Sequence, residues 1–407
     1  MKTAAILAEL NPLHNGHAAL IEHAKNVRGA DAVIVLLSGD FVQRGEPAVI
    51  SKMRRCRAAL SAGADLVLEL PLIYCLAPAE IYARGAVLTL DALGIVDEML
   101  FGSETGDLQS LSSTAEMIDL LSEDPEFHDR ILAAMRDGDP YPAAFSKAVG
   151  ASGHQTDVED PSALIPADRP NDLLGMEYVR SIRKLNSAIM PVCMRRMPQG
   201  NEISSATKLR ELIKNDVSTI RPFVPDASWR EVSEIAVSDS ERFAEPDDLS
   251  QILMYRLLAS DPKKLSEIAD IGQDLGQRIY HSRLSCEHFG SYAAALKVKA
   301  FTLSRIRRSL LQLIFGITQK ERSGMLSEKA TLLRVLGFRE NARNLLSRIA
   351  ENSSARMIVR GADFHADLSG SEKRLAELAL FSGALYDSLT LSASLRKPEE
   401  EKMPVIA

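Results

Sequence analysis

The chain has 407 residues, of which 46% are apolar and 25% charged, and its formal net charge is −7. This composition excludes disordered and collagen-like chains, and the length predicts at least two hydrophobic cores. No apolar run reaches the roughly 20 residues that span a bilayer, the first residues carry no signal-type cleavage pattern, and the four cysteines lack CxxC spacing. We therefore expect a soluble cytoplasmic protein without a disulfide framework or zinc knuckle.

The first hundred residues alternate between short apolar runs and amphipathic stretches. The pattern predicts strands over 3–8, 32–37, 66–70 and 98–101, and helices over 17–26, 52–62 and 79–93. Near-continuous runs of Val, Ile and Leu are typical of parallel strands buried on both faces. Right-handed crossovers then give an α/β fold with a doubly wound parallel sheet.

The rest of the chain continues this pattern and then becomes mainly helical. The sequence predicts helical structure over 108–150, a polar loop over 152–170, a helix over 171–185, a strand over 188–194 and a capped helix over 205–215. From 249 to about 346 the periodicity is mostly helical, 356–359 fits a strand and 372–385 a helix. We expect a catalytic domain over 1–220, a proline-punctuated linker over 221–248, a mainly α-helical domain over 249–390 and a frayed charged tail over 391–407.

The strongest chemical signal is the segment Asn11-Pro12-Leu13-His14-Asn15-Gly16-His17, directly after the first predicted strand. Pro and Gly favour a sharp turn, and the following helix offers free N–H groups and a positive dipole end to a phosphate. Two imidazoles beside that turn can donate hydrogen bonds to phosphoryl oxygens or stabilise a leaving pyrophosphate. The alternative is a pair of polar surface histidines. Strand, turn and helix in this order favour nucleotide binding.

Two further segments lie where such a site is expected. Residues 202–210 read EISSATKLR, in which a serine caps a helix whose first turns carry Lys208 and Arg210; this is either a second phosphate clamp or an ordinary capped helix. Phe41, Gln43 and Arg44 follow the second predicted strand, and they line an acyl or cytosine pocket or form an ordinary loop.

Six motifs in order resemble a known family. AELNPLHNGH, SGDFVQRGEPAVI, GADLVLELP, FGSE, RPNDLLGMEY and ISSATKLR are similar to the HxGH nucleotidylyltransferase superfamily and, within it, to the bacterial tRNA(Met) cytidine acetate ligases. The resemblance implies that acetate and ATP form acetyl-adenylate and diphosphate. The exocyclic N(4) amine of the wobble cytidine of elongator tRNA(Met) then takes the acetyl group, which gives N(4)-acetylcytidine and AMP.

The resemblance also implies roles for individual residues. The expected catalytic residues are His14, His17 and Arg210. The expected ATP-binding residues are Ala8, Glu9, Asn11, Pro12, His14, Gly16, His17, Ile21, Gly102, Asn171, one of Arg195 and Arg196, Ser205 and Thr207. We expect Mg²⁺ to be held mainly by the ATP phosphates, and no metal site made of side chains.

Basic residues outside these motifs are expected to hold the tRNA. They are Lys52 and Arg54 in the second predicted helix, and Lys297, Lys299, Arg305, Arg307 and Arg308 on a later one. A basic helix face suits a phosphate backbone, although many such faces are simply solvated.

Three departures from the family pattern lie close to the expected site. Leu10 and Leu13 replace aromatic residues, and Asp172 stands where asparagine is frequent. They leave both histidines intact but can alter how the base or acetate packs. Two other functions stay open: an adenylyltransferase that acts on a small phosphorylated metabolite, and a non-catalytic protein that binds ATP and tRNA. The sequence predicts no oligomeric state.

Overall fold

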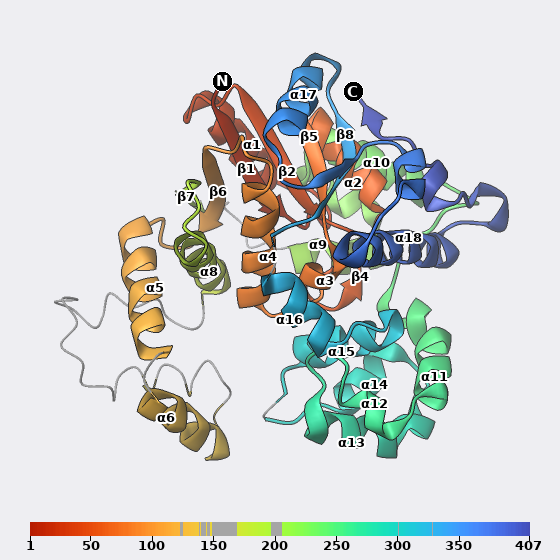
Figure 1. Cartoon of the computed structure of the whole chain (residues 1–407). Coiled ribbons are helices and arrows are strands. Elements are labelled where there is room, and N and C mark those ends of the chain that lie inside the picture. Colours follow the sequence, from red (N-terminus) through yellow and green to blue (C-terminus); the bar gives the residue numbers. More distant parts are fainter. Residues whose placement is uncertain are drawn as a thin grey trace.

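The computed structural model describes residues 1–122, 125–137, 139, 144, 147–148, 169–196, 206–299, 301–327 and 329–407. Its centre is a mostly parallel sheet (Figure 1). The sheet contains β1 (Thr3–Ala8), β2 (Ala32–Ser38), β5 (Leu66–Leu70), β6 (Glu98–Ser103) and β7 (Met190–Arg195). All five strands were expected from their apolar runs, and they pair in parallel in the order β5-β2-β1-β6-β7. The doubly wound α/β fold is thereby confirmed.

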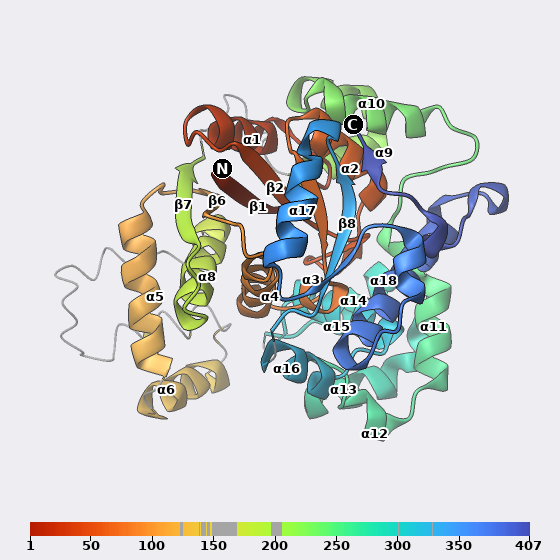
Figure 2. The ribbon, with the colours of Figure 1, turned by 45° about the horizontal axis from the view of Figure 1, so that its top comes forward.

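Helices cover both faces of this sheet, because alternate strand residues point to opposite sides. Ala4 and Ile6 of β1 join a core with α1 (Asn15–Asn26) and α2 (Lys52–Ser61). Ala5 and Leu7 join the larger core with α3 (Leu72–Cys75), α4 (Ala79–Asp91) and α8 (Pro170–Lys184). Figure 2 shows α1 and α4 on opposite sides of β1 and β2. Next to α8 lies α5 (Leu108–Ser122), and α6 (Pro125–Arg136) packs against α5.

The chain then crosses to a group of helices beside the sheet. It passes through α9 (Ala206–Asn215) and α10 (Asp226–Ala236), so the expected linker contains a helix, and α10 packs on α2. The group consists of α11 (Ser250–Ala259), α12 (Pro262–Leu265), α13 (Gly272–Ser282), α14 (Phe289–Ala295), α15 (Leu303–Phe315) and α16 (Gln319–Ser327). Thr302 caps the N-terminus of α15, and Gly316 ends it with a left-handed conformation at φ 64°.

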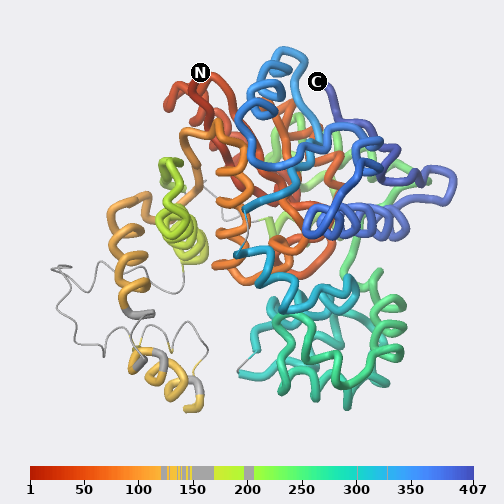
Figure 3. Tube along the Cα trace, viewed as in Figure 1, coloured from red at the N-terminus to blue at the C-terminus, as the bar shows by residue number. Residues whose placement is uncertain are grey.

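The last part of the chain returns to the sheet, which the sequence did not lead us to expect (Figure 3). Residues within the expected helical stretch form β8 (Leu332–Phe338), which pairs antiparallel with β5. Next to β8 lie β9 (Arg356–Ile358), which was expected as a strand, and β10 (Val405–Ile406). The helices α17 (Arg343–Asn352) and α18 (Gly370–Thr390) complete this part. The expectation of helical structure up to about 346 was wrong here because β8, which is buried at every position, is a short, mostly apolar run that periodicity does not separate from a buried helix segment.

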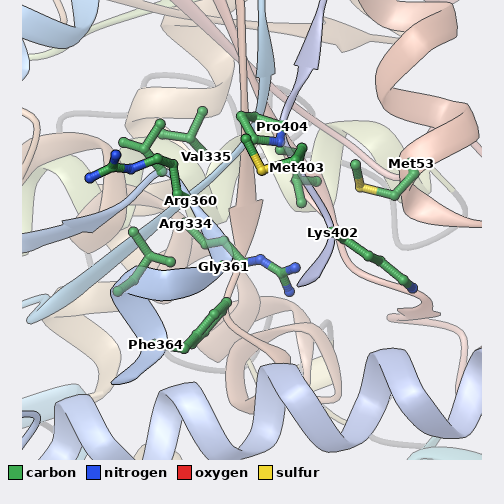
Figure 4. A pocket seen from close by; sticks show the side chains of 12 residues that line it. Met53, Arg334, Val335, Arg360, Gly361, Phe364, Lys402, Met403 and Pro404 are labelled. Carbon is green, nitrogen blue, oxygen red and sulfur yellow. The ribbon is translucent and has the colours of Figure 1, made fainter. Parts of the chain in front are cut away.

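The expected frayed tail is in fact anchored in the interior. Glu399 is 1% exposed, and it pairs with Lys52 Nζ at 2.8 Å and with Arg334 at 2.6 Å. Lys52 also contacts Asp40 and Glu69. Figure 4 shows a pocket beside this cluster that Arg334 and Phe364 help to line. The Arg334 guanidinium lies 5.1 Å from the centroid of the Phe364 ring. Charge pairing, which the periodicity of the tail does not reveal, holds this segment in place.

Within the described part of the chain, the helices are too short or too polar to cross a membrane.

Candidate functional site

The two histidines of the HxGH segment form one rigid unit at the carboxyl end of β1. His14 caps α1 by accepting a hydrogen bond from the Gly16 N–H at its Nδ1 (3.1 Å), and His17 Nδ1 accepts from the His14 N–H (3.3 Å). The rings are stacked, with their centroids 3.7 Å apart. A Cβ on Gly16 would meet His14 at 3.0 Å, so a glycine is favoured there.

Both imidazoles are neutral at physiological pH. Burial and then the neighbouring Arg196 lower the pKa of His14 to about 4, and burial together with His14 and Arg196 holds the pKa of His17 well below its usual value. Because each Nδ1 accepts a backbone N–H, the proton of each neutral ring is on Nε2. The pair can therefore offer Nε2–H donors to a phosphate without carrying a charge of its own.

This neutrality predicts how stability depends on pH. The unfolded chain binds a proton at His14 below about pH 6.5, whereas the folded chain does so only near pH 4, so this residue makes stability fall as the pH decreases between those values. His14→Asn keeps a capping acceptor and should remove this contribution, which is at most about 3 kcal/mol. Urea unfolding at pH 7, 6 and 5 should show a shallower pH dependence for the variant. Parallel curves would contradict the assignment.

A second group of residues approaches the histidines from β6, β7 and α8. Arg196, just after β7, donates to Asn171 Oδ1 at 2.9 Å, and Glu104 accepts from the Asn171 side chain and from the Asp172 N–H. A Cβ on Gly102 would meet Arg196 Cγ at 3.3 Å. The sequence left the choice between Arg195 and Arg196 open, and the structure brings Arg196 to the histidines while Arg195 is exposed. Glu104 ends the FGSE motif, and the sequence alone indicates no role for it.

Arg210 joins the site from α9. It donates to the Asn11 carbonyl at 3.0 Å and pairs with Glu46 at 3.0 Å, and its Nη2 lies 3.5 Å from Thr207 Oγ1. Glu46 also pairs with Arg307 of α15. Arg210, the expected catalytic arginine, thus holds the turn through the Asn11 carbonyl. Glu46 links it to α15 of the helical group. Ser205, which we expected to bind ATP, lies outside the described residues.

The other predicted ATP-binding residues lie along the same turn. Asn11 is 1% exposed and accepts the Val49 N–H, Ile21 lies on the buried face of α1, and Ala8 ends β1. Pro12 follows a cis peptide bond in the turn. Glu9 follows β1 directly.

The departures from the family pattern have structural roles. Leu10 and Leu13 are 1% and 0% exposed and belong to the core under α1, so they pack the turn from the inside. Asp172 is fully buried and accepts hydrogen bonds from Ser103 and from the backbone N–H groups of Glu104 and Thr105. Phe41 is fully buried against the rings of Phe315 and Tyr386.

Lys52 and Arg54, the two residues of α2 that we expected to hold tRNA, both face carboxylates of this chain. Lys52 is 1% exposed and faces the carboxylates that hold the C-terminal segment. Arg54 pairs with Glu231, Glu234 and Glu241. The expectation that these two side chains are exposed was wrong, because the C-terminal segment covers Lys52 and helix α10 pairs with Arg54.

The later basic segment divides into two parts. Arg305 donates to the Asp270 carbonyl, Arg307 pairs with Glu46, and Arg308 is 9% exposed and donates to the Gln43 carbonyl. These three arginines mainly join α15 to its surroundings. Lys297 and Lys299 are exposed and precede α15, which begins only at Leu303.

Comparisons with known proteins identify the family and support the fold. The chain matches the HIGH nucleotidyl transferase family over residues 1–402. It is 32% identical to the tRNA(Met) cytidine acetate ligase of Acetivibrio thermocellus over 98% of both chains, and 32% identical to the same-named protein of Caldanaerobacter subterraneus over 95% of both. The crystal structure of Thermotoga maritima TmcAL bound with alpha-thio ATP is similar with a TM-score of 0.88 and 26% identity, over 100% of this chain and 99% of that one.

Proposed function

We propose the function of this chain from one premise: it belongs to the tRNA(Met) cytidine acetate ligase family of the HIGH nucleotidyl transferases. It is an ATP-dependent enzyme that forms acetyl-adenylate from acetate and ATP and then acetylates the N(4) amine of the wobble cytidine of elongator tRNA(Met). The stacked pair of neutral histidines at the end of β1 is the observation that carries the proposal. A tRNA substrate implies that the reaction takes place in the cytoplasm.

The site supports this reaction by binding and charge stabilisation. An acetate oxygen attacks the α-phosphorus of ATP, and the bond to the β-phosphate oxygen breaks. Fixed donors at the place where negative charge develops stabilise such a transition state. His14 and His17 offer Nε2–H groups, and Arg196 adds a positive charge next to them. A protein that only binds ATP and tRNA has no need for such donors.

Magnesium enters as part of the nucleotide. Among the described residues there is no group of three or more His, Cys, Asp or Glu side chains that could hold a metal ion. We infer that Mg²⁺ arrives on the ATP phosphates, which it neutralises, and that the protein holds the complex through the nucleotide.

Incubation with ATP, Mg²⁺, acetate and unmodified tRNA(Met), followed by nucleoside mass analysis, tests the proposed function. We expect acetate-dependent release of AMP and diphosphate and a cytidine heavier by one acetyl group. Turnover without acetate or tRNA would favour a different adenylyltransferase, and bound but intact ATP would favour a binding protein.

We propose that the helical part of the chain contributes to tRNA binding through Lys297 and Lys299. Both side chains are exposed and precede α15. Lys297→Glu with Lys299→Glu should raise the KM for tRNA. The slope of log affinity against log salt concentration should become less steep by about two, which corresponds to two lost phosphate contacts. Acetate-dependent exchange of diphosphate into ATP should not change.

The exposed Lys397 provides a matched control for that pair. Lys397→Glu alters net charge in the same direction without touching the segment before α15, and we expect little change in KM. An unchanged salt slope in the double variant would remove this segment from the binding surface.

A further inference from the structure

Glu9 has a position in the site that binding to ATP does not explain. It directly follows β1, and its Oε1 accepts the backbone N–H of Gln43 at 2.9 Å. Its carbonyl accepts from Arg55, a fully buried guanidinium that also binds the carbonyls of Ser38 and Gly39 at the end of β2. The carboxylate is therefore fixed at the edge of the sheet where β1 and β2 end, which is where ligands bind in open α/β sheets.

One carboxylate oxygen of Glu9 is left for a ligand. Within the described part of the chain, Oε2 has no hydrogen-bond or ion-pair partner, although the side chain is half-buried. Arg44, at the tip of the hairpin formed by β3 (Phe41–Val42) and β4 (Glu46–Pro47), and Arg210 are the cations that act on it most strongly. Their positive charges stabilise the ionised carboxylate of Glu9 in this position.

The other acidic groups nearby are occupied. Glu104 binds the start of α8 with both oxygens, and Glu46 is shared between Arg210 and Arg307. Asp172 and Asp40 likewise accept with both oxygens. The histidines have a proton on Nε2 and an occupied Nδ1, so they can donate but not take up a proton.

We propose that Glu9 is the general base of the second half-reaction, and that its Oε2 takes the proton that the cytidine N(4) amine loses when it is acetylated. The inference rests on the proposed function. The amine nitrogen forms a bond to the acetyl carbonyl carbon, the bond from that carbon to the AMP phosphate oxygen breaks, and AMP leaves as an anion. The N(4) proton moves to Glu9 and then to water, so that charge and atoms balance.

The electrostatic surroundings suit this role. Burial raises the pKa of Glu9 above its usual value, while Arg44, Arg210 and the Gln43 N–H oppose that rise. A base with a raised pKa removes a proton more effectively, provided that it is still ionised at working pH. The titratable and charged groups that interact with this carboxylate are Arg44, Glu46, Arg55, Cys75, Tyr82, Tyr178 and Arg210.

The test starts from preformed acetyl-adenylate, so that it bypasses ATP binding and adenylation. Single-turnover acetyl transfer to unmodified tRNA(Met) is followed by nucleoside mass analysis from pH 5 to 8. We expect Glu9→Gln to transfer about 100- to 10,000-fold more slowly than the natural protein. In the natural protein the rate should rise with pH through one ionisation above 4.5 and then level off, and the variant should lack that ionisation.

Glu46→Gln is the matched control, because it removes a neighbouring negative charge beside the same Arg210. Its transfer rate should still show one ionisation, moved to lower pH because the negative charge of Glu46 helps to raise the pKa of Glu9. Glu9→Asp keeps a carboxylate but shortens the side chain by one methylene group. Its transfer rate should lie between those of the natural protein and Glu9→Gln, and its pH profile should still show the ionisation. Melting temperatures of all variants show whether they fold.

Three results would overturn the inference. They are transfer by Glu9→Gln within about threefold of the natural rate, a pH profile unchanged in that variant, and natural-protein transfer with no ionisation above 4.5. A failure of the proposed function would look different. In that case the natural protein itself would neither acetylate tRNA nor exchange diphosphate into ATP in the presence of acetate.

Discussion

His17→Asn should lower the rate of acetyl-adenylate formation by about 100- to 1,000-fold, the loss that follows removal of one donor from a charge-stabilising site. Asparagine places an acceptor where Nδ1 lies and so keeps the bond from the His14 N–H, but it lacks a donor at the Nε2 position. His17→Gln places its amide N–H near that position and should retain more of the rate. Acetate-dependent exchange of labelled diphosphate into ATP measures both.

The exposed His288 at the start of α14 gives a control outside the site. His288→Asn should leave exchange unchanged. tRNA binding, measured without ATP, should be nearly the same in all three variants. Equal losses for asparagine and glutamine at position 17 would show that ring packing against His14, and not the Nε2–H donor, is what the site requires.

Lys52→Met should destabilise the protein by about 3–5 kcal/mol, which is the usual effect of removing one partner from a buried ion pair. The side chain is 1% exposed and contacts Asp40, Glu69 and Glu399. Burial opposes its positive charge, whereas the surrounding carboxylates raise the pKa of Lys52 above its usual value. Lys52, Arg334 and Lys402 in turn lower the pKa of Glu399 against the effect of burial. Urea unfolding, followed by circular dichroism, measures the loss.

Arg57→Ala is a control on the same helix. Arg57 is 42% exposed and pairs with Glu231, so its loss should change stability by no more than about 1 kcal/mol. The pair of variants also distinguishes the two roles considered for Lys52. A stable Lys52→Met protein with a higher KM for tRNA would restore the expectation of a tRNA contact and would contradict the buried network.

The sheet and its ligand edge could be predicted because local signals determine them. Strand β1 was expected with its observed bounds, since six consecutive apolar or small residues end at a turn rich in Pro and Gly. The histidines of the turn were found for the same reason. Their position at the end of a strand, followed by a helix, is enough to suggest where a phosphate binds.

The parts that could not be predicted depend on distant contacts. A lysine in an amphipathic helix is usually exposed, and the burial of Lys52 follows from Glu399, which is remote in sequence. The basic residues of α15 are turned inward for a similar reason, because Arg308 meets the Gln43 carbonyl of the hairpin. The periodicity of a sequence indicates which residues share one face of a helix, but it does not indicate which distant segment packs on that face.

The anchoring of residues 399–406 also has a consequence for how the chain folds during translation. Lys52 and β5 leave the ribosome long before Glu399 and β8, their partners in the finished sheet. Until those partners arrive, a growing chain holds an uncovered sheet edge and an incompletely paired cluster of charges, both of which favour chaperone binding. A fragment that ends near residue 220 has the same deficits permanently. Expression of the nucleotide-binding part therefore requires the segment that follows the helical group.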